Sequence, residues 1–330
     1  MIPASQGKWE AVFHQTHHGS NRGIPMSGSA QQKLVIAVSS RALFDLEESN
    51  RVFESQGAEA YIGHQIELEQ EVLTPGVAFD LVRKLLALNG KQERGDGHLP
   101  SPQVEVILIS RNNADAGVRI LNSLRHHGLP ISRAVFTTGR PPYGYARAFG
   151  AHLFLSANAA DVRGALEAGI AAATIHPALR REGPAEEIRI AFDGDAVLFS
   201  DASERIYKTE GLEAFRRHEE DHAATPLEKG PFAGFLDALH RIQKAHAEAG
   251  GPIRTALITA RGGAAAKRVI HTLRGWGIRI DESIFLDGAD KGPFLEAFGA
   301  DIFFDDQTRH VESAGRYVNA AHVASGVANE

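Results

Sequence analysis

The 330-residue sequence contains no cysteine, which excludes disulfide bonds and thiolate metal sites. This absence suits a reducing compartment, and we expect a cytoplasmic protein. No apolar run approaches the roughly 18 residues of a membrane span. The first 30 residues are rich in Ser, Gly, Gln and His and contain no secretory apolar segment. We therefore expect a polar tail over residues 1–32 and no membrane partner.

The sequence also has no excess of positive charge. Lys and Arg number 35 against 41 Asp and Glu, which gives a formal net charge of −6. Because a nucleic-acid-binding surface concentrates positive charge, we expect no nucleic acid polymer as a partner. Neither a GxxxxGK loop nor a GxGxxG fingerprint occurs, so the nucleoside triphosphatase and dinucleotide-binding classes lack support.

Short apolar runs rich in β-branched residues alternate with helical stretches along the chain. LVIAV (34–38), VEVILIS (104–110), RAVFTT (133–138) and AHLFLS (151–156) have the composition of buried parallel strands. DAGVRILNSLRHHG (115–128) has apolar residues at helical spacing and a closing glycine. Such alternation predicts an α/β fold built on a parallel sheet.

A second set of strands and helices repeats the pattern of the first. Residues 107–157 set against 256–306 without gaps give 15 identical positions of 51. Residues 34–82 set against 188–236 give 11 identical positions of 49. The offsets, 149 and 154, differ by five residues, which fall in the polar loop 89–103. We therefore predict a tandem duplication of one Rossmann-like parallel-sheet unit.

The repeat defines the expected domains. The halves span about residues 33–182 and 186–320, and they are joined near REGPAEE (181–187). Residues 321–330 are expected to form a tail.

Polar side chains follow the strands expected in the second half. They are Asp193 and Asp195, Thr259, Lys291, and Asp305 and Asp306. Because ligands bind beyond the carboxyl ends of parallel strands, these side chains should converge on one crevice. Carboxylates form an oxygen site for Mg²⁺, and a Thr hydroxyl and a Lys hold phosphate oxygens. One carboxylate can accept a phosphoryl group while a second moves protons. Each residue alone has an ordinary explanation as a turn, cap or surface group; the ordered set predicts phosphate chemistry.

The order of these motifs resembles that of haloacid-dehalogenase-type phosphatases. DGDAV (193–197), LIT (257–259), Lys291 and FFDD (303–306) match their four motifs. The longer segments AFDGDAVLFSD, PLEKGPF, LITAR, DKGPFL and IFFDDQ resemble the cytosolic 5′-nucleotidase I family, as does AVSSRALFD in the first half. The resemblance covers about residues 33–315. It implies Mg²⁺-dependent hydrolysis of nucleoside 5′-monophosphates, AMP being the first expectation.

The resemblance also implies roles, carried over motif by motif. Asp193 is the nucleophile that becomes an aspartyl phosphate, and Asp195 is the general acid and base. Thr259 and Lys291 hold the phosphate. The implied Mg²⁺ site comprises Asp193, Asp195, Asp305 and Asp306.

Relatives place a small helical cap between the first and second motifs, which corresponds to about residues 201–252. GLEAFRRHEEDH (211–222) and GPFAGFLDALHRIQKAH (230–246) suit two helices of such a cap. Besides Thr259 and Lys291, the expected substrate contacts are Phe215, Lys229 and Arg261.

The first half lacks the catalytic side chains at the corresponding positions. Asp193, Asp195, Thr259, Lys291 and Asp305 correspond to Ser39, Arg41, Ser110, Pro142 and Ser156. We therefore expect one active site per chain, in the second half. The first half is either a scaffold or a site that binds a phosphate without Mg²⁺, because Arg can supply the positive charge. The candidate nucleotide effector site comprises Ser39, Arg41, Ser110 and Arg111.

Other functions remain open at this point. HEEDH (218–222) matches the zinc-protease signature H-E-x-x-H, but charged neighbours suggest a solvated helix face and no third ligand is evident. The chain is alternatively a phosphatase of another small phosphomonoester, or a nucleotide sensor without turnover. The oligomeric state is open as well: many enzymes form homo-oligomers, whereas the duplicated halves could pack like a dimer within one chain.

Overall fold

A computed structural model of the chain describes residues 33–90, 103–175, 187–246 and 251–330. The expected tail at 1–32 and almost all of the joining segment at 181–187 lie outside these residues. The described strands are β1 (Leu34–Val38), β2 (Val104–Ser110), β3 (Arg133–Phe136), β4 (Leu153–Ser156), β5 (Ala172–Ile175), β6 (Ile188–Phe192), β7 (Ile253–Thr259), β8 (Glu282–Phe285), β9 (Ile302–Asp305) and β10 (Ala320–His322).

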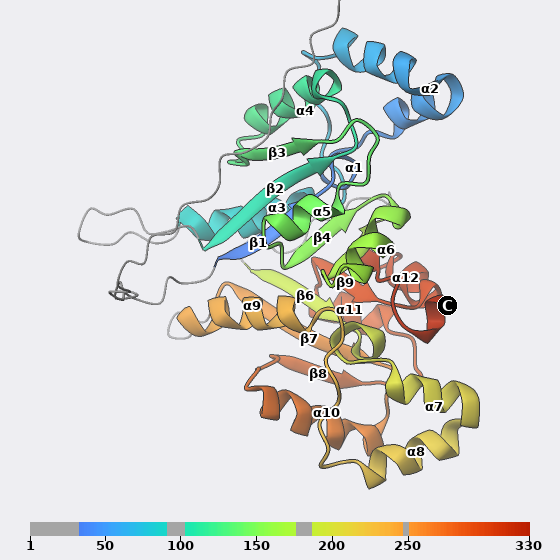
Figure 1. The fold of residues 1–330 in the computed structure, drawn as a ribbon. Helices are drawn as coiled ribbons and strands as arrows, with labels where there is room; N and C mark the ends of the chain where they lie inside the picture. The colour runs from blue at the N-terminus through green and yellow to red at the C-terminus, as the bar shows by residue number, and fades with distance from the viewer. Residues whose placement is uncertain (1–32, 91–102, 176–186, 247–250) are drawn as a thin grey trace, which may run out of the picture. The chain divides into compact units, whose positions relative to one another are not determined.

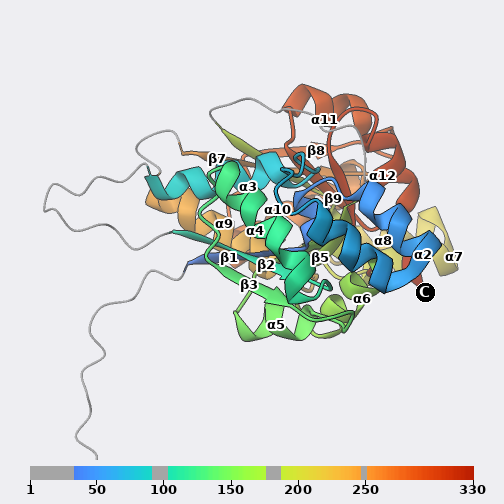
Figure 2. The same ribbon diagram turned by 90° about the horizontal axis from the view of Figure 1, so that it is seen from above.

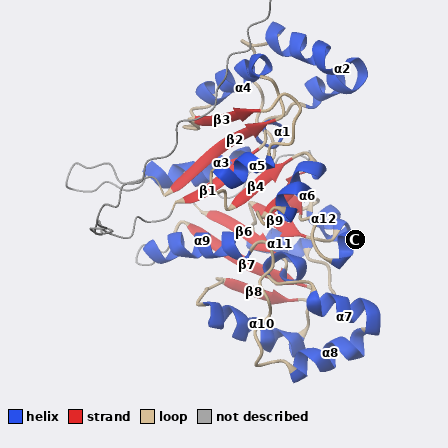
Figure 3. Ribbon diagram, viewed as in Figure 1, coloured by secondary structure: helices blue, strands red, loops and turns tan. Residues whose placement is uncertain are grey.

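The described helices are α1 (Ser40–Leu43), α2 (Glu47–Glu67), α3 (Phe79–Ala87), α4 (Ala114–His126), α5 (Tyr143–Ala148), α6 (Ala159–Glu167), α7 (Ala202–Glu210), α8 (Leu212–Asp221), α9 (Ala233–Ala245), α10 (Gly263–Trp276), α11 (Gly292–Phe298) and α12 (Thr308–Ala314), with the short turns η1 (Leu88–Gly90), η2 (Gly194–Leu198) and η4 (Val327–Asn329). These helices pack against the sheet, except that α2 projects beyond one end of it and α7 and α8 project beyond the other (Figure 3). Among the described residues, no helix combines the length and the apolar composition that crossing a membrane requires.

All ten strands belong to one sheet in the order β3-β2-β1-β4-β5-β10-β9-β6-β7-β8 (Figure 1). Neighbouring strands are parallel, except that β10 runs antiparallel to β5. The expected α/β class with a mostly parallel sheet is confirmed.

The central strands are largely apolar because helices pack on both faces of the sheet (Figure 2). In β1, Leu34, Ile36 and Val38 contribute to the core cluster that contains α3, α4, α9 and α10. The alternate residues Val35 and Ala37 contribute to a second cluster with α5 and α6. A third cluster joins β6, β7 and β9 to α11 and α12.

The two halves have the same strand order. From its outer edge inward, the first half runs β3-β2-β1-β4-β5 and the second runs β8-β7-β6-β9-β10. Matching hydrogen bonds support the correspondence. The amide of Leu73 donates to Ser123 Oγ at 2.9 Å, and the amide of Leu227 donates to Thr272 Oγ1 at the same distance.

The expected cap differs in extent from the projecting helices. α7 and α8 meet at Gly211, whose φ of +86° suits glycine, and α8 packs on α10. In contrast, α9 buries Phe235, Leu236 and Leu239 in the core cluster beneath the sheet. The expected segment 201–252 therefore includes one helix of the sheet layer.

The C-terminal residues are not the expected tail. β10 pairs with both β9 and β5, and Ala321 is completely buried between them. Asn329 then donates to the backbone carbonyl of Asp306 at 3.0 Å. The sequence AAH has no β-branched run, so the pairing was not evident from composition.

Candidate active site

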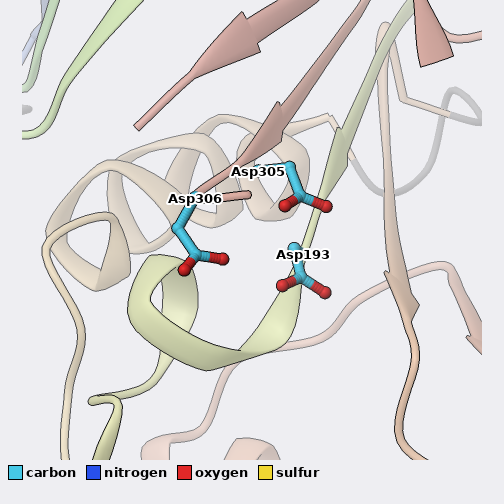
Figure 4. Close-up of side chains that lie close together, drawn as sticks. All are labelled: Asp193, Asp305 and Asp306. Atoms are coloured by element: carbon cyan, nitrogen blue, oxygen red, sulfur yellow. The ribbon is translucent and has the colours of Figure 1, made fainter. Parts of the chain in front are cut away.

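Three carboxylates gather at the carboxyl ends of β6 and β9. Asp193 directly follows β6, Asp305 ends β9, and Asp306 follows it. One oxygen from each lies within 4.8 Å of the others, and all three side chains are buried. Figure 4 shows them facing a common space. The parallel alignment of β6 and β9 brings these distant segments of sequence together.

Lys291 links two of the carboxylates. It lies at the start of α11, and its Nζ is 2.7 Å from Asp193 Oδ1 and 2.6 Å from Asp305 Oδ2. His310 Nδ1 lies 3.2 Å from the same Asp305 oxygen. A buried ammonium between two buried carboxylates compensates part of their desolvation.

The pKa values of these carboxyl groups separate accordingly. Burial raises the pKa of Asp193 to about 6 against the opposing effect of Lys291. Burial would also raise the pKa of Asp305, but Lys291 and His310 together hold it below its ordinary value. Burial and the charges of Asp193 and Asp305 raise the pKa of Asp306 to about 9.

Asp306 identifies the position at which a cation fits. Both of its carboxylate oxygens are buried, and neither has a hydrogen-bond partner among the described residues. A carboxylate left without donors is costly to bury, whereas oxygen ligands of this kind suit Mg²⁺. The donor set of Asp193, Asp305 and Asp306 therefore fits a hard divalent cation.

Asp195 lies on an unusually wide turn. The amide of Phe199 bonds to the carbonyl of Gly194, five residues earlier, whereas Phe44 bonds to Ser40, four residues earlier. The hydrogen-bonded turn of the second half thus spans one residue more than its counterpart, and Ala196 takes a φ of +57°. Wide helical turns of this kind occur frequently at functional sites.

Arg261 holds the Asp195 carboxylate. Its Nε and Nη2 donate to the two carboxylate oxygens at 2.8 and 2.5 Å. Thr259 Oγ1 accepts from the amide of Arg261 at 3.2 Å, and an added Cβ on Gly194 would lie 3.3 Å from that hydroxyl. The close approach of Gly194 brings η2 against the end of β7.

A cavity of about 680 Å³ opens next to this site, and Asp305, Asp306 and Lys291 are not part of its lining. Its lining includes Asp193, Asp195, Phe215, Thr259 and Arg261. Lys291 lies buried next to Asp193.

Lys229, also expected to contact the substrate, does not line this cavity. Its Nζ lies 5.5 Å from the centroid of the Trp276 ring, and its backbone bridges to Phe199. The polar composition of PLEKGPF gave no sign of this position.

Glu219 is a buried residue next to the site that the sequence did not indicate. It is completely buried and accepts hydrogen bonds from Arg261 at 2.6 Å, Arg268 at 2.8 Å and Ser203 at 2.7 Å. It therefore joins the cap to the arginine that holds Asp195. Because every residue of HEEDH is polar, the sequence did not show that the Glu219 side chain is the one that faces inward.

The zinc reading of the same segment lacks a ligand set. The rings of His218 and His222 stack with centroids 4.1 Å apart. Among the described residues, the carboxylate group of Asp193, Asp305 and Asp306 is the only cluster of three or more candidate metal ligands.

Further cavity residues were also missed. Gln307 Nε2 donates to the buried Glu204 at 3.2 Å, and burial raises the pKa of Glu204. Both residues line the cavity, as does His310. The signal available for Gln307 and His310 was their place just after the strand end at Asp305.

A second cavity, of about 360 Å³, lies in the first half. Ser39, Arg41, Ser110 and Arg111, the four residues of the candidate effector site, all line it.

Fold and site together define a class of protein with an acidic, cation-compatible centre at the carboxyl ends of a mostly parallel sheet. A family model described as 5′-nucleotidase matches residues 26–330. The chain belongs to the 5′-nucleotidase family.

Two individual similarities accompany this match. The chain is 39% identical over 312 residues to human cytosolic 5′-nucleotidase 1B, covering 92% of this chain and 50% of that protein. The chain thus spans about half the length of the curated relative it matches. Histidinol dehydrogenase from Elizabethkingia anophelis aligns over 87% of this chain and 79% of its own, with a TM-score of 0.22 and 9% identity, too low to bear on fold or function.

Proposed function

We propose that the chain is a Mg²⁺-dependent 5′-nucleotidase that hydrolyses nucleoside 5′-monophosphates to nucleoside and phosphate. The observation that carries the proposal is the buried trio of Asp193, Asp305 and Asp306 with Lys291, in a chain of the 5′-nucleotidase family. The partner is accordingly a small nucleotide. The human relative is named a cytosolic enzyme, and we propose the same compartment here.

Asp193 acts as the nucleophile in this proposal. With a pKa of about 6, it is mostly ionised at neutral pH. A carboxylate oxygen attacks the phosphorus, the bond to the 5′-oxygen breaks, and an aspartyl phosphate forms. Lys291 and the Thr259 hydroxyl hold the phosphate oxygens during this transfer.

Asp195 supplies the proton to the leaving 5′-oxygen and then removes one from the water that hydrolyses the aspartyl phosphate. Asp195 is held in an ion pair with Arg261, and substrate binding would have to break this pair. We propose that the phosphate attracts donors of Arg261 and releases Asp195 toward the leaving oxygen. Glu219 keeps Arg261 in place during the exchange.

Asp193, Asp305 and Asp306, together with the backbone carbonyl of Asp195, would hold the Mg²⁺. When bound, the cation neutralises charge on the phosphate and on the surrounding carboxylates. The unpartnered oxygens of Asp306 support this ligand set.

The cap is proposed to bind the nucleoside. Tyr207 and Phe215 line the cavity, and their rings meet edge to face with centroids 6.2 Å apart. Arg261 lies 5.6 Å from the centroid of the Phe215 ring, which connects the aromatic pair to the phosphate end of the cavity. We propose that this pair contacts the base, and that AMP is a substrate.

The corresponding strand orders support a tandem duplication of a haloacid-dehalogenase-like unit. We propose halves of about residues 33–182 and 186–320 and a cap limited to α7 and α8. The second half alone retains the carboxylates and is the catalytic half.

Phosphate release from a panel of nucleoside 5′-monophosphates tests the function. We expect release that requires Mg²⁺, stops with EDTA and exceeds release from sugar phosphates. Preferential release from sugar phosphates would replace the nucleotidase with a phosphatase of another phosphomonoester. Nucleotide binding without any release would indicate a sensor.

A further inference from the structure

We propose that the first half contains a second binding site, which takes a nucleoside phosphate without a metal ion. Its cavity of about 360 Å³ lies at the carboxyl ends of β1, β2 and β4 and has the size of a small-molecule site. All of its lining residues belong to the first half, whereas those of the catalytic cavity belong to the second. The two cavities are therefore distinct.

The chemistry of this cavity excludes a copy of the catalytic centre. Ser39, Ser156 and Ala157 occupy the positions that correspond to the three buried carboxylates, and all three line the cavity. Ser39 Oγ and Ser156 Oγ accept backbone amide hydrogen bonds, so they stabilise local turns. The metal ligands are replaced by neutral groups, and a phosphate here must be met by protein donors.

Two such donors are available. Arg41 Nε and Asn112 Nδ2 are buried and have no hydrogen-bond partner among the described residues, although both residues line the cavity. Arg41 Nη2 bonds to Glu47 at 2.7 Å, which orients the guanidinium while Nε remains open. A buried donor without an acceptor is costly, and an anionic oxygen bound next to either group would satisfy it.

Arg111 was expected to bind the ligand of this cavity, but its guanidinium is bonded to protein groups. Its Nε and Nη2 donate to the two oxygens of Asp161 at 2.9 and 2.5 Å, and its Nη1 donates to the carbonyl of Gly139 at 2.8 Å. These bonds commit the guanidinium to the wall of the cavity. Arg41 is therefore the cation assigned to the phosphate.

An aromatic pair indicates that the ligand also carries a base. Phe53 and Tyr61 meet edge to face with centroids 6.1 Å apart, at an interplanar angle of 87°. At an offset of 154 they correspond to Tyr207 and Phe215, which meet at 6.2 Å and 78°.

Tyr61 also connects the pair to the donor end of the cavity. Its hydroxyl donates to Asn112 Oδ1 at 3.1 Å, so the ring is tied to a residue that offers a free donor. In the second half, Arg261 lies over the Phe215 ring and likewise connects the aromatic pair to the polar end of its cavity. The assignment of a nucleoside to this pair rests on the proposed function of the second half.

The test uses the full chain carrying Asp193→Asn, so that bound nucleotide is not hydrolysed. AMP is titrated calorimetrically in EDTA, with adenosine and inorganic phosphate as separate probes. We expect AMP to bind in EDTA, and Arg41→Gln and Tyr61→Ala each to weaken that binding at least about tenfold. Phe215→Ala, the counterpart of Tyr61→Ala, should instead weaken the AMP binding that appears on adding Mg²⁺.

Several outcomes would overturn the proposal. The first is AMP binding in EDTA that neither Arg41→Gln nor Tyr61→Ala weakens. The second is binding of inorganic phosphate as tight as that of AMP. The third is no binding of AMP in EDTA.

Photolabelling with 8-azidoadenosine monophosphate in EDTA gives a readout that needs no substitution in the cavity. We expect the label on α2, and label confined to α7 and α8 would contradict the proposal. Labelling of α2 in a chain that releases no phosphate from nucleotides would reject the proposed function and leave the second site intact.

Discussion

Asp306 is the residue at which the need for a cation is greatest. Its carboxyl group is buried beside two other carboxylates, and no donor among the described residues reaches its oxygens. Lys291 satisfies Asp193 and Asp305 instead. The metal-free centre therefore keeps a proton on Asp306 that a divalent cation would displace.

The free energy of unfolding should depend on pH because of this proton on Asp306. The pKa of Asp306 is about 9 and that of Asp193 about 6, both raised from 3.8. Between the ordinary pKa of 3.8 and the raised pKa of Asp306, about 9, the folded state binds more protons than the unfolded state. The free energy of unfolding in EDTA therefore falls as the pH rises from about 4 to 9.

We expect the melting temperature in EDTA to decline by at least about 5 °C from pH 5 to pH 9, since roughly 1 kcal/mol corresponds to 2–4 °C at this chain length. Asp306→Asn should flatten the decline, and the exposed control Asp221→Asn should not. Mg²⁺ should stabilise more strongly at the higher pH. An Asp306→Asn protein with an undiminished decline would reject the assignment.

The sequence allowed the gathering of the three carboxylates and Lys291 to be predicted, because each follows an apolar strand. It did not reveal that Arg261 pairs with Asp195, because that contact depends on the close packing of η2 against β7. Nor did the sequence indicate that Lys229 lies over Trp276, because a charged residue in a loop carries no signal of the direction its side chain takes.

At the scale of elements, one buried acid links α7 and α8 to the rest of the second half. Glu219 in α8 bonds to Arg261 beside β7, to Arg268 in α10 and to Ser203 in α7. The helical period of HEEDH allowed a helix to be predicted, but not which of its acids is buried. The sequence likewise did not indicate the wide turn η2, because the two halves align without a gap across it.

Glu219→Ala should leave two buried guanidinium groups without their shared acceptor. Breaking a buried ion pair in this way costs about 3–5 kcal/mol, so we expect the unfolding free energy to fall by this order. Asp195 should also lose its fixed orientation, which should reduce kcat more than it changes KM.

The neighbouring Glu220 is exposed and provides the matched control. Glu220→Ala should change stability by no more than about 0.5 kcal/mol, measured by denaturant unfolding. Equal effects of the two substitutions would contradict the role given to Glu219.

At the scale of the whole described unit, the two halves share one sheet through β10. This strand belongs to the second half and pairs with β5 of the first. A buried ion pair between Lys84 Nζ and Asp301 Oδ1, at 2.6 Å, also crosses between the halves. The internal repeat predicted two similar units, but not their antiparallel junction, because the short AAH segment has little strand character.

Ala321→Pro should break this junction. Proline lacks the amide hydrogen that a central strand donates, and Ala321 pairs with both Ile175 and Phe304. We expect a loss of at least about 3 kcal/mol in the free energy of unfolding. Ala321→Gly, which keeps the amide, should cost only about 1 kcal/mol. Similar unfolding curves for the two variants would show that β10 does not hold the halves together.

The central claim is that catalysis takes place in the second half through Asp193. The most direct measurement compares Mg²⁺-dependent phosphate release from AMP by the wild type, Asp193→Asn and Ser39→Ala, since Ser39 is the counterpart of Asp193. We predict that Asp193→Asn lowers kcat by at least about a thousandfold. Ser39→Ala should remain within about threefold of the wild type. Retained turnover in Asp193→Asn, or its loss in Ser39→Ala alone, would contradict the account.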